Sequence, residues 1–232
     1  MKLQKYGITL ERITEADIEM VRKYRNSAEI KNFMQFRKRI TKSMQKKWFE
    51  SIDNYLNYYF IIIFEGKKIG LINIKNIDWI KNTDVSESGL FLWDWNYIDS
   101  PAPLLASIIL SEFGYGVLCG ENSKIKILKS NKKAVDFNKK LGYSEIESYP
   151  DGFAMYMQTK DSFISATAQL RKKALVFCNN DPALYMVIEP NDWNNDKGKY
   201  LYDYLKMKNH NYSKQSNGNT EVYKFLFDFS LF

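Results

Sequence analysis

The feature that most constrains this chain is the stretch Val85–Phe113, in which a strand, a loop and a helix follow one another directly. Val85–Trp93 predicts a strand with two unequal faces. Asn96–Pro103 interrupts that pattern. Leu104–Phe113 then predicts an apolar helix opened by Pro101, because proline is favoured at a first helical position. A strand that runs through a loop into a helix N-terminus is a common anion-binding arrangement. The stretch therefore favours an α/β fold with a ligand site at its centre.

The loop within this stretch departs from the usual composition of a phosphate-binding loop. Such loops are rich in glycine, so that backbone N–H groups can approach the ligand. Here Ile98–Pro103 contains no glycine, Pro101 and Pro103 lack N–H groups, and Asp99 is acidic. We therefore expect a cofactor site whose phosphate contact is altered.

The segments on either side predict a mixed, mostly antiparallel sheet flanked by helices, which is an α/β (α+β) fold class. The elements expected before the central stretch are a strand at Ile8–Leu10, helices after Thr14 and Thr41, a hairpin of Tyr58–Glu65 with Lys68–Ile77, and a turn at Trp79–Thr83. Those expected after it are strands at Lys124–Leu128, Ser144–Ser148 and Phe153–Gln158, and a helix capped by Ser130 and ended by Gly142. Three antiparallel strands thus precede the central helix.

Polarity rises near Thr159–Thr167, where we place a boundary between residues 1–160 and a small C-terminal α/β extension, residues 161–232. The elements expected in the extension are strands at Ala174–Cys178, Ala183–Glu189 and Val222–Phe229, a helix through Tyr200, Tyr204 and Met207, and a loop at Asn209–Thr220. These elements are too few for an independent core, so we expect the extension to pack on the first domain.

Composition narrows the function classes. The net charge of +7 favours anionic partners such as coenzyme A, nucleotides, nucleic acid or an acidic membrane, without choosing among them. A single histidine, His210, argues against a His-based zinc site and a Ser-His-Asp triad. Cys119 and Cys178 are expected to be free thiols. The longest apolar run, Tyr58–Phe64, is too short to span a membrane, so we expect a cytoplasmic protein.

Four short motifs occur in order between Tyr6 and Gln158. They are Arg25-Asn26 followed by Ala28-Glu29-Ile30, then Glu65–Gly70, then Ile77-Asp78-Trp79 with Ser86–Leu92, and finally Asn131–Tyr143. Together they resemble the GNAT superfamily of N-acetyltransferases. Within it, the chain is most similar to bacterial enzymes that acetylate the amino group of nucleotide-linked amino sugars in the synthesis of surface polysaccharide or other glycans.

The resemblance implies acetyl-CoA as co-substrate, no metal, and a role for each matching residue. Glu87 would be the catalytic base that takes the proton of the acceptor amine. Arg25 and Asn26 would bind the acceptor. The residues implied in cofactor binding are Leu92, Trp93, Ser100, Asn131 and Asn138. Of these, Leu92 and Trp93 would pair through their backbone with the pantetheine arm.

Each of these residues also has an ordinary structural explanation. Glu87 could be a strand carboxylate paired with a lysine, and Leu92 and Trp93 could be core residues. Asn131 could cap a helix. Arg25 and Asn26 could end the first helix by bonding backbone carbonyl groups. The residues alone leave these alternatives open.

Two departures from the family pattern open a second function class. The glycine-rich pyrophosphate loop is missing from Ile98–Ser107, and Asn138 stands where a tyrosine often protonates the departing thiolate. The alternatives are therefore a catalytically inactive binding or scaffold domain, and a protein N-acetyltransferase. The partner expected is a small-molecule acceptor, with no nucleic acid and no membrane span; a homodimer is left open.

Overall fold

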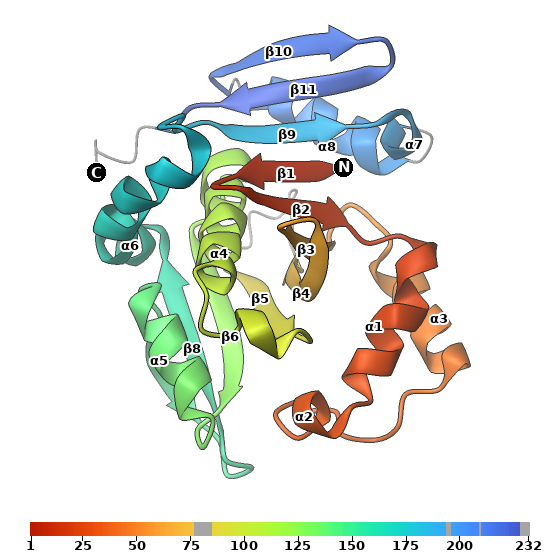
Figure 1. Cartoon of the computed structure of the whole chain (residues 1–232), viewed down its shortest axis with the longest axis vertical. Helices are drawn as coiled ribbons and strands as arrows, with labels where there is room; N and C mark the ends of the chain where they lie inside the picture. The colour runs from red at the N-terminus through yellow and green to blue at the C-terminus, as the bar shows by residue number, and fades with distance from the viewer. Residues whose placement is uncertain (77–84, 194–195, 209, 228–232) are drawn as a thin grey trace.

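The computed structural model describes residues 1–76, 85–193, 196–208 and 210–227; the predicted turn Trp79–Thr83 and the motif fragment Ile77-Asp78-Trp79 lie outside them. The described strands form one sheet in the order β10-β11-β9-β1-β2-β3-β4-β5-β6-β8-β7 (Figure 1). All neighbouring strands in it are antiparallel except β5 and β6, which are parallel. The predicted fold class, a mixed and mostly antiparallel sheet flanked by helices, is confirmed.

The strands are β1 (Lys2–Lys5), β2 (Ile8–Arg12), β3 (Tyr58–Phe64), β4 (Lys67–Lys75), β5 (Val85–Leu92), β6 (Asn122–Leu128), β7 (Ser144–Ser148), β8 (Phe153–Thr159), β9 (Leu184–Ile188), β10 (Tyr212–Asn217) and β11 (Thr220–Phe225). The helices are α1 (Ile18–Arg25), α2 (Ala28–Lys31), α3 (Lys42–Ile52), α4 (Ala102–Glu112), α5 (Lys132–Lys140), α6 (Lys160–Ala174), α7 (Pro190–Trp193) and α8 (Asp196–Met207). A π turn, Phe113–Val117, continues α4.

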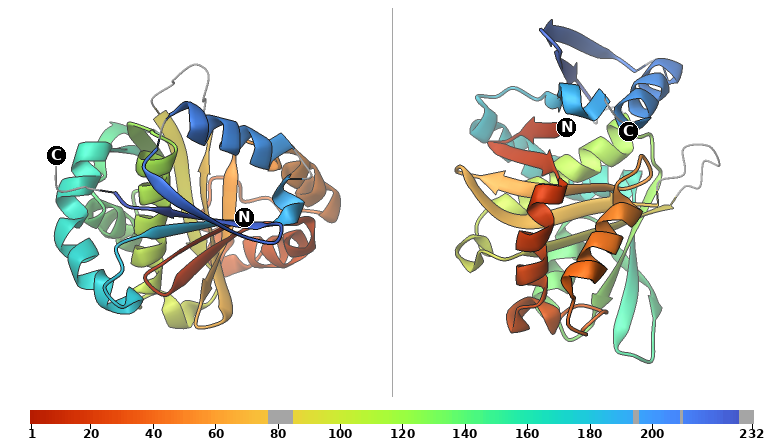
Figure 2. Two further views of the ribbon diagram at one scale, coloured as in Figure 1. Left: turned by 90° about the horizontal axis from the view of Figure 1, so that it is seen from above. Right: turned by 90° about the vertical axis from the view of Figure 1, so that its right-hand side faces the viewer.

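Helices cover both faces of the sheet, with α1 and α3 on one side and α4 and α5 on the other (Figure 2). β3 shows why. Its run of seven apolar residues has no alternation, because Tyr58 and Phe60 enter the core under α4 while Tyr59 and Ile61 enter the core under α1 and α3. β4 pairs with this buried strand and β5 pairs with β4, and β4 and β5 carry the candidate site.

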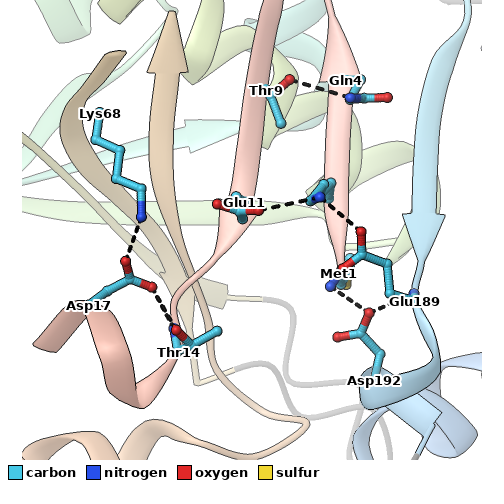
Figure 3. Close-up of polar contacts among 10 residues, drawn as sticks. Met1, Gln4, Thr9, Glu11, Thr14, Asp17, Lys68, Glu189 and Asp192 are labelled. Carbon is cyan, nitrogen blue, oxygen red and sulfur yellow. Dashed lines mark hydrogen bonds and ion pairs between the residues drawn. The ribbon is translucent and has the colours of Figure 1, made fainter. Parts of the chain in front are cut away.

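The extension continues the sheet instead of standing apart from it. β9 pairs with β1 in antiparallel register, and β11 and β10 follow. Lys2 Nζ lies 2.8 Å from Glu189 and 3.4 Å from Glu11, so charges also link the two parts (Figure 3). The division of the chain into a domain of residues 1–160 and an extension of residues 161–232 that packs on it stays a prediction.

Two predictions within the extension are wrong. Ala174–Cys178 is not a strand: Ala174 ends α6, and Leu175–Cys178 forms a 3-10 turn. The predicted loop Asn209–Thr220 contains β10. This edge strand is almost wholly exposed, so apolar and polar residues do not alternate in its sequence. Only its pairing with β11 identifies it as a strand.

Asp17, which comes just before α1, links the first helix to the sheet (Figure 3). Its carboxylate accepts hydrogen bonds from Lys68 Nζ at 2.7 Å, Thr14 Oγ1 at 2.8 Å and Thr14 N–H at 3.1 Å. Burial alone would raise the pKa of Asp17, but these hydrogen bonds outweigh it and hold the pKa below its usual value. The charged carboxylate is therefore the form that stabilises the fold.

Replacing Asp17 with Asn is expected to lower the free energy of unfolding by about 1–2 kcal/mol at neutral pH. A carboxyl with a depressed folded-state pKa contributes stability that is fully present above its unfolded pKa, about 3.9, and is lost as pH falls through the folded value. The difference between wild type and variant should therefore shrink below about pH 4, which denaturant unfolding at several pH values would measure. A difference that stays constant from pH 7 to pH 3 would contradict this assignment.

Candidate functional site

The site is built where the two parallel strands at the middle of the sheet separate. β5 and β6 pair only over Val85–Glu87 with Asn122–Lys124. Beyond that point β5 continues along β4 to Leu92, and β6 continues along β8 to Leu128. We call the two unpaired segments, Ser88–Leu92 and residues 125–128, the strand fork. Its inner edges are lengths of strand backbone with no partner strand among the described residues.

The hydrogen-bond alternation of β5 shows which backbone groups face the fork. The N–H of Trp93 donates to the carbonyl of Ile69 at 3.0 Å, on the β4 side. Since successive residues of a strand direct these groups to opposite sides, Leu92 and Leu90 direct theirs toward the fork. Of the two residues predicted to pair with pantetheine, Leu92 directs its backbone groups toward the fork. Trp93 has its N–H bonded to β4.

The side chain of Trp93 lies in the core on the α1 side. It is 6% exposed, its ring stacks on Tyr24 at 4.9 Å, and its indole N–H donates to the carbonyl of Lys68. This is the structural alternative that the sequence left open for Trp93. Gly70 explains how β5 approaches β4 so closely here. A Cβ at Gly70 would lie 2.7 Å from the carbonyl oxygen of Phe91.

The N-terminus of α4 lies after the carboxyl end of β5, as expected. Ser100 Oγ accepts the N–H of Ala102 at 3.2 Å and donates to the carbonyl of Tyr97 at 2.8 Å. The N–H of Leu105 is bonded to the carbonyl of Pro101, and Pro103 has no N–H. Among the described residues of this first turn, Leu104 therefore has the N–H group that is left without a hydrogen bond. The hydroxyl of the predicted site residue Ser100 is thus engaged within this loop and the first turn of α4.

Asp99 and α5 line the same end of the molecule. Asp99 Oδ1 lies 3.7 Å from Lys133 Nζ, and both side chains are strongly exposed. Asn131, and not the predicted Ser130, caps α5: its Oδ1 accepts the N–H of Ala134 at 3.2 Å. Asn138 is 8% exposed, and its side-chain amide donates to the Ala134 carbonyl at 2.8 Å. The structure thus brings the predicted residues of α4 and α5 to one end, each with a hydrogen bond inside its own segment.

Glu87 lies on the opposite face of the sheet, under α1 and α3. Glu87 Oε1 is 2.9 Å from Lys75 Nζ, its cross-strand partner, and the Glu87 side chain is 33% exposed. Burial, together with the nearby Glu87 charge, raises the pKa of Tyr59 to about 12. Glu87 is therefore held in an ion pair that a general base would have to release.

Sequence reasoning missed Asn73, which lies between Glu87 and the middle of this face. Asn73 pairs with Gly89 across β4 and β5, and a Cβ at Gly89 would lie 2.9 Å from Asn73 Oδ1. The absence of a side chain at Gly89 is what lets the Asn73 amide lie across β5. The signal was present in the motif around Gly89, where the glycine has no turn to explain it.

Arg25 and Asn26, the residues predicted to bind the acceptor, differ in how they are engaged. The Asn26 side chain donates to the carbonyl of Ile40 at 2.9 Å and accepts the Ile40 N–H at 2.7 Å, so it fastens the segment before α3. Arg25 lies over the ring of Phe91, with Cζ 5.7 Å from the ring centre. Its Nη1 is buried and has no hydrogen-bond partner within the described residues. Burial lowers the pKa of Arg25, which nonetheless stays charged at neutral pH.

Other chemistry-bearing groups lie outside this site. Cys119 Sγ is 3.6 Å from His210 Nε2, a contact that 91 residues of separation hid from sequence reasoning. Across the residues that can be described, His, Cys, Asp and Glu side chains do not gather in groups of three that could hold a metal ion. None of the helices in those same residues is long and apolar enough to cross a membrane.

Solved structures share this fold. Apo FdhC, a nucleotide-linked sugar GNAT, has a TM-score of 0.58 and 23% identity, covering 73% of this chain and 96% of its own. AAC(6')-Ib with ribostamycin and coenzyme A has a TM-score of 0.58 and 20% identity, covering 68% and 96%. A domain from Methanocaldococcus jannaschii DSM 2661 has a TM-score of 0.57 and 18% identity, covering 66% and 97%. The chain therefore has the GNAT fold. No family model matches the sequence, and no curated protein matches it.

Proposed function

We propose that the chain is an acetyl-CoA-dependent N-acyltransferase acting on the amino group of a nucleotide-linked amino sugar. The observation that carries the proposal is the strand fork. It offers unpaired backbone groups of Leu90 and Leu92 next to the N-terminus of α4, in a fold that occurs in AAC(6')-Ib with coenzyme A bound. A pantetheine arm carries amide groups, which can complete the hydrogen bonds of an unpaired strand edge.

The residues around the fork fit a coenzyme held mainly by its pantetheine arm. The side chains of Asn131 and Asn138 lie on α5, and Ser100 and Leu104 lie at the start of α4. A helix N-terminus favours negative charge, so the N–H of Leu104 is a donor for a phosphate. Asp99 opposes that charge, although Lys133 beside it offsets the effect. Acetyl-CoA would supply the activated acyl group, and the proposal includes no metal.

Glu87 would act as the base on the other face. Attack by the acceptor needs a neutral amine, and a carboxylate can take the amine proton directly or through one water. Lys75 holds the Glu87 carboxylate in place until an acceptor arrives. Asn73, beside Gly89, would then hydrogen-bond the acceptor or the acyl carbonyl group.

The buried guanidinium group of Arg25 favours an acceptor that carries an anionic group. A buried guanidinium nitrogen without a partner is costly, and a phosphate or carboxylate of the acceptor would satisfy it. The fold match to FdhC, a nucleotide-linked sugar GNAT, agrees with a sugar bearing phosphates. We propose such an acceptor for surface polysaccharide or glycan synthesis in the cytoplasm; association into a homodimer stays open.

Isothermal titration with acetyl-CoA and with CoA tests the proposal. Binding of both is expected, and absence of both at millimolar ligand would contradict it. A panel of amines then identifies the acceptor: nucleotide-linked amino sugars, aminoglycosides, and peptides with free amino termini. Turnover of the sugars supports the proposed acceptor, whereas turnover of the peptides alone would make the chain a protein N-acetyltransferase.

Replacing Arg25 with Met is expected to raise the KM for an anionic acceptor by about 10–100-fold, the value of one hydrogen bond to a charged group. Met keeps the length and apolar contact of the side chain over Phe91. Steady-state kinetics with a nucleotide-linked amino sugar would measure the change. Lys38→Met, which removes an exposed charge from the segment between α2 and α3, is the matched control. Equal KM values for Arg25→Met and wild type would remove Arg25 from acceptor binding.

The loop before α4 favours a second candidate, a binding or scaffold domain without catalysis. Ser100 already bonds the Ala102 N–H, and Pro101 and Pro103 supply no donors. This loop offers a phosphate fewer groups than a glycine-rich loop does. Titration that shows no CoA or acetyl-CoA binding to a folded protein would favour this candidate.

A further inference from the structure

Three hydroxyl groups are hydrogen-bonded in a row on one face of the sheet, at the point where the strand fork begins. We call this row the hydroxyl chain. Tyr143 OH donates to Ser123 Oγ at 3.1 Å, and Ser123 Oγ lies 2.7 Å from Ser88 Oγ. Ser88 is the first residue of β5 beyond its paired segment with β6. The chain therefore ends at the unpaired backbone, on the face covered by α4 and α5.

The inner end of this hydroxyl chain is fixed. Tyr143 is 7% exposed and Ser123 is 4% exposed. Tyr143 follows Gly142, whose φ of +95° turns the chain at the end of α5. A Cβ at Gly142 would lie 2.5 Å from the Ser162 carbonyl oxygen, so this turn requires glycine. Burial raises the pKa of Tyr143, which keeps the phenol protonated and acting as a donor.

One arrangement of these hydrogen bonds leaves the hydrogen of Ser88 available to a ligand. A hydroxyl group carries one hydrogen and two lone pairs. Ser123 Oγ accepts from Tyr143 and has a second lone pair, so in its 2.7 Å contact with Ser88 Oγ either hydroxyl can be the donor. When Ser123 is the donor, the hydrogen of Ser88 is free to point toward the fork. Ser88 is half-buried.

We propose that Ser88 donates a hydrogen bond to the thioester sulphur of acetyl-CoA, with Ser123 and Tyr143 as positioning residues; this rests on the proposed function. When the neutral amine attacks, the C–N bond forms, the C–S bond breaks, and its electron pair moves to sulphur. Glu87 takes the amine proton. The thiolate leaves with the Ser88 hydrogen bond and takes a proton from water, and the hydroxide that remains takes the proton held by Glu87, which restores the carboxylate. Tyr143 gives up no proton, because a buried phenolate would have no counter-ion. Asn138 therefore need not replace the missing tyrosine acid.

The test measures the pKa of the CoA thiol in the complex, from the ultraviolet absorbance of the thiolate during a pH titration. Ser88→Ala is expected to raise that pKa by about one to two units, the value of one hydrogen bond to a charged group. Tyr143→Phe keeps the ring and its packing, and is expected to raise it by a smaller amount. Ser86→Ala is the matched control: Ser86 Oγ lies two residues earlier on the same face and donates to the Asn122 carbonyl at 3.2 Å.

Each outcome decides the proposal. A thiol pKa in Ser88→Ala equal to that of wild type, with CoA still bound, would overturn it. An equal rise in Ser86→Ala would also overturn it, because a general disturbance of β5 would then be the cause. If Ser88→Ala fails to fold, an unchanged pKa in Tyr143→Phe overturns the proposal and a raised one supports it. Wild-type protein that binds no CoA would instead contradict the proposed function, before any variant is made.

Discussion

Replacing Lys5 with Met is expected to lower the free energy of unfolding by about 3–5 kcal/mol, as for other buried ion pairs that lose one partner. Lys5 Nζ lies 2.7 Å from Glu112 Oε2, and the two side chains are 5% and 1% exposed. Burial raises the pKa of Glu112, and Lys5 and the hydroxyl of Tyr6 act against that rise. Without Lys5, the carboxylate of Glu112 would be left inside the core at the end of α4 without this partner. Urea unfolding at neutral pH measures the loss.

A double variant controls for the change in side-chain shape. Lys5→Met with Glu112→Gln leaves no buried charge without a counter-ion and keeps an acceptor for Tyr6 OH. It is expected to be more stable than Lys5→Met alone. A loss below about 1 kcal/mol in Lys5→Met would mean that the pair behaves as an exposed ion pair does.

Replacing Glu87 with Gln is expected to lower kcat by about 10²–10⁴, the usual value of a general base. Gln keeps the shape and reach of the side chain and loses only its basicity. The deficit should shrink at high pH, where more of the acceptor amine is already neutral. Kinetics from pH 6 to pH 9, with an acceptor found in the amine panel, would show this.

Binding of acetyl-CoA separates this role from a structural one. Glu87 faces the α1 side of the sheet, away from α4 and α5, so its replacement should leave the Kd of acetyl-CoA unchanged. Lys75→Met removes the other half of the ion pair and keeps the carboxylate, and it is the matched control. If Glu87→Gln turns over at the wild-type rate at every pH, the carboxylate is only the partner of Lys75.

The middle of the fold could be predicted because its local patterns and its tertiary contacts agree. The alternation of β5, the glycine turn before β4 and Gly142 after α5 each report a backbone feature that the structure contains. The ends of the sheet could not be predicted in this way. β1 is short and mostly polar in sequence, and it lies inside the sheet only because β9 pairs with its outer edge.

The candidate site shows the same division. Glu87 and Leu92 were named from the resemblance to the GNAT motifs, and their roles stay predictions; the alternation of β5 adds only which way each of them faces. The link from Ser88 through Ser123 to Tyr143 joins residues 35 and 20 positions apart, and no periodicity reports such a contact. Glu112 did carry a signal. A lone carboxylate in an otherwise apolar helix implies a buried cation, although the sequence does not say which.

The place of β1 in the sheet also has a consequence for how the protein is made. β1 pairs with β2 along one edge and with β9 along the other. β9, Leu184–Ile188, comes about 180 residues later in the chain than β1. During synthesis, the outer edge of β1 remains open until most of the chain has left the ribosome. Contacts at such separation slow folding, and an open strand edge can pair with a neighbouring nascent chain. The residues that follow the GNAT-like part therefore act as the closing element of its first strand.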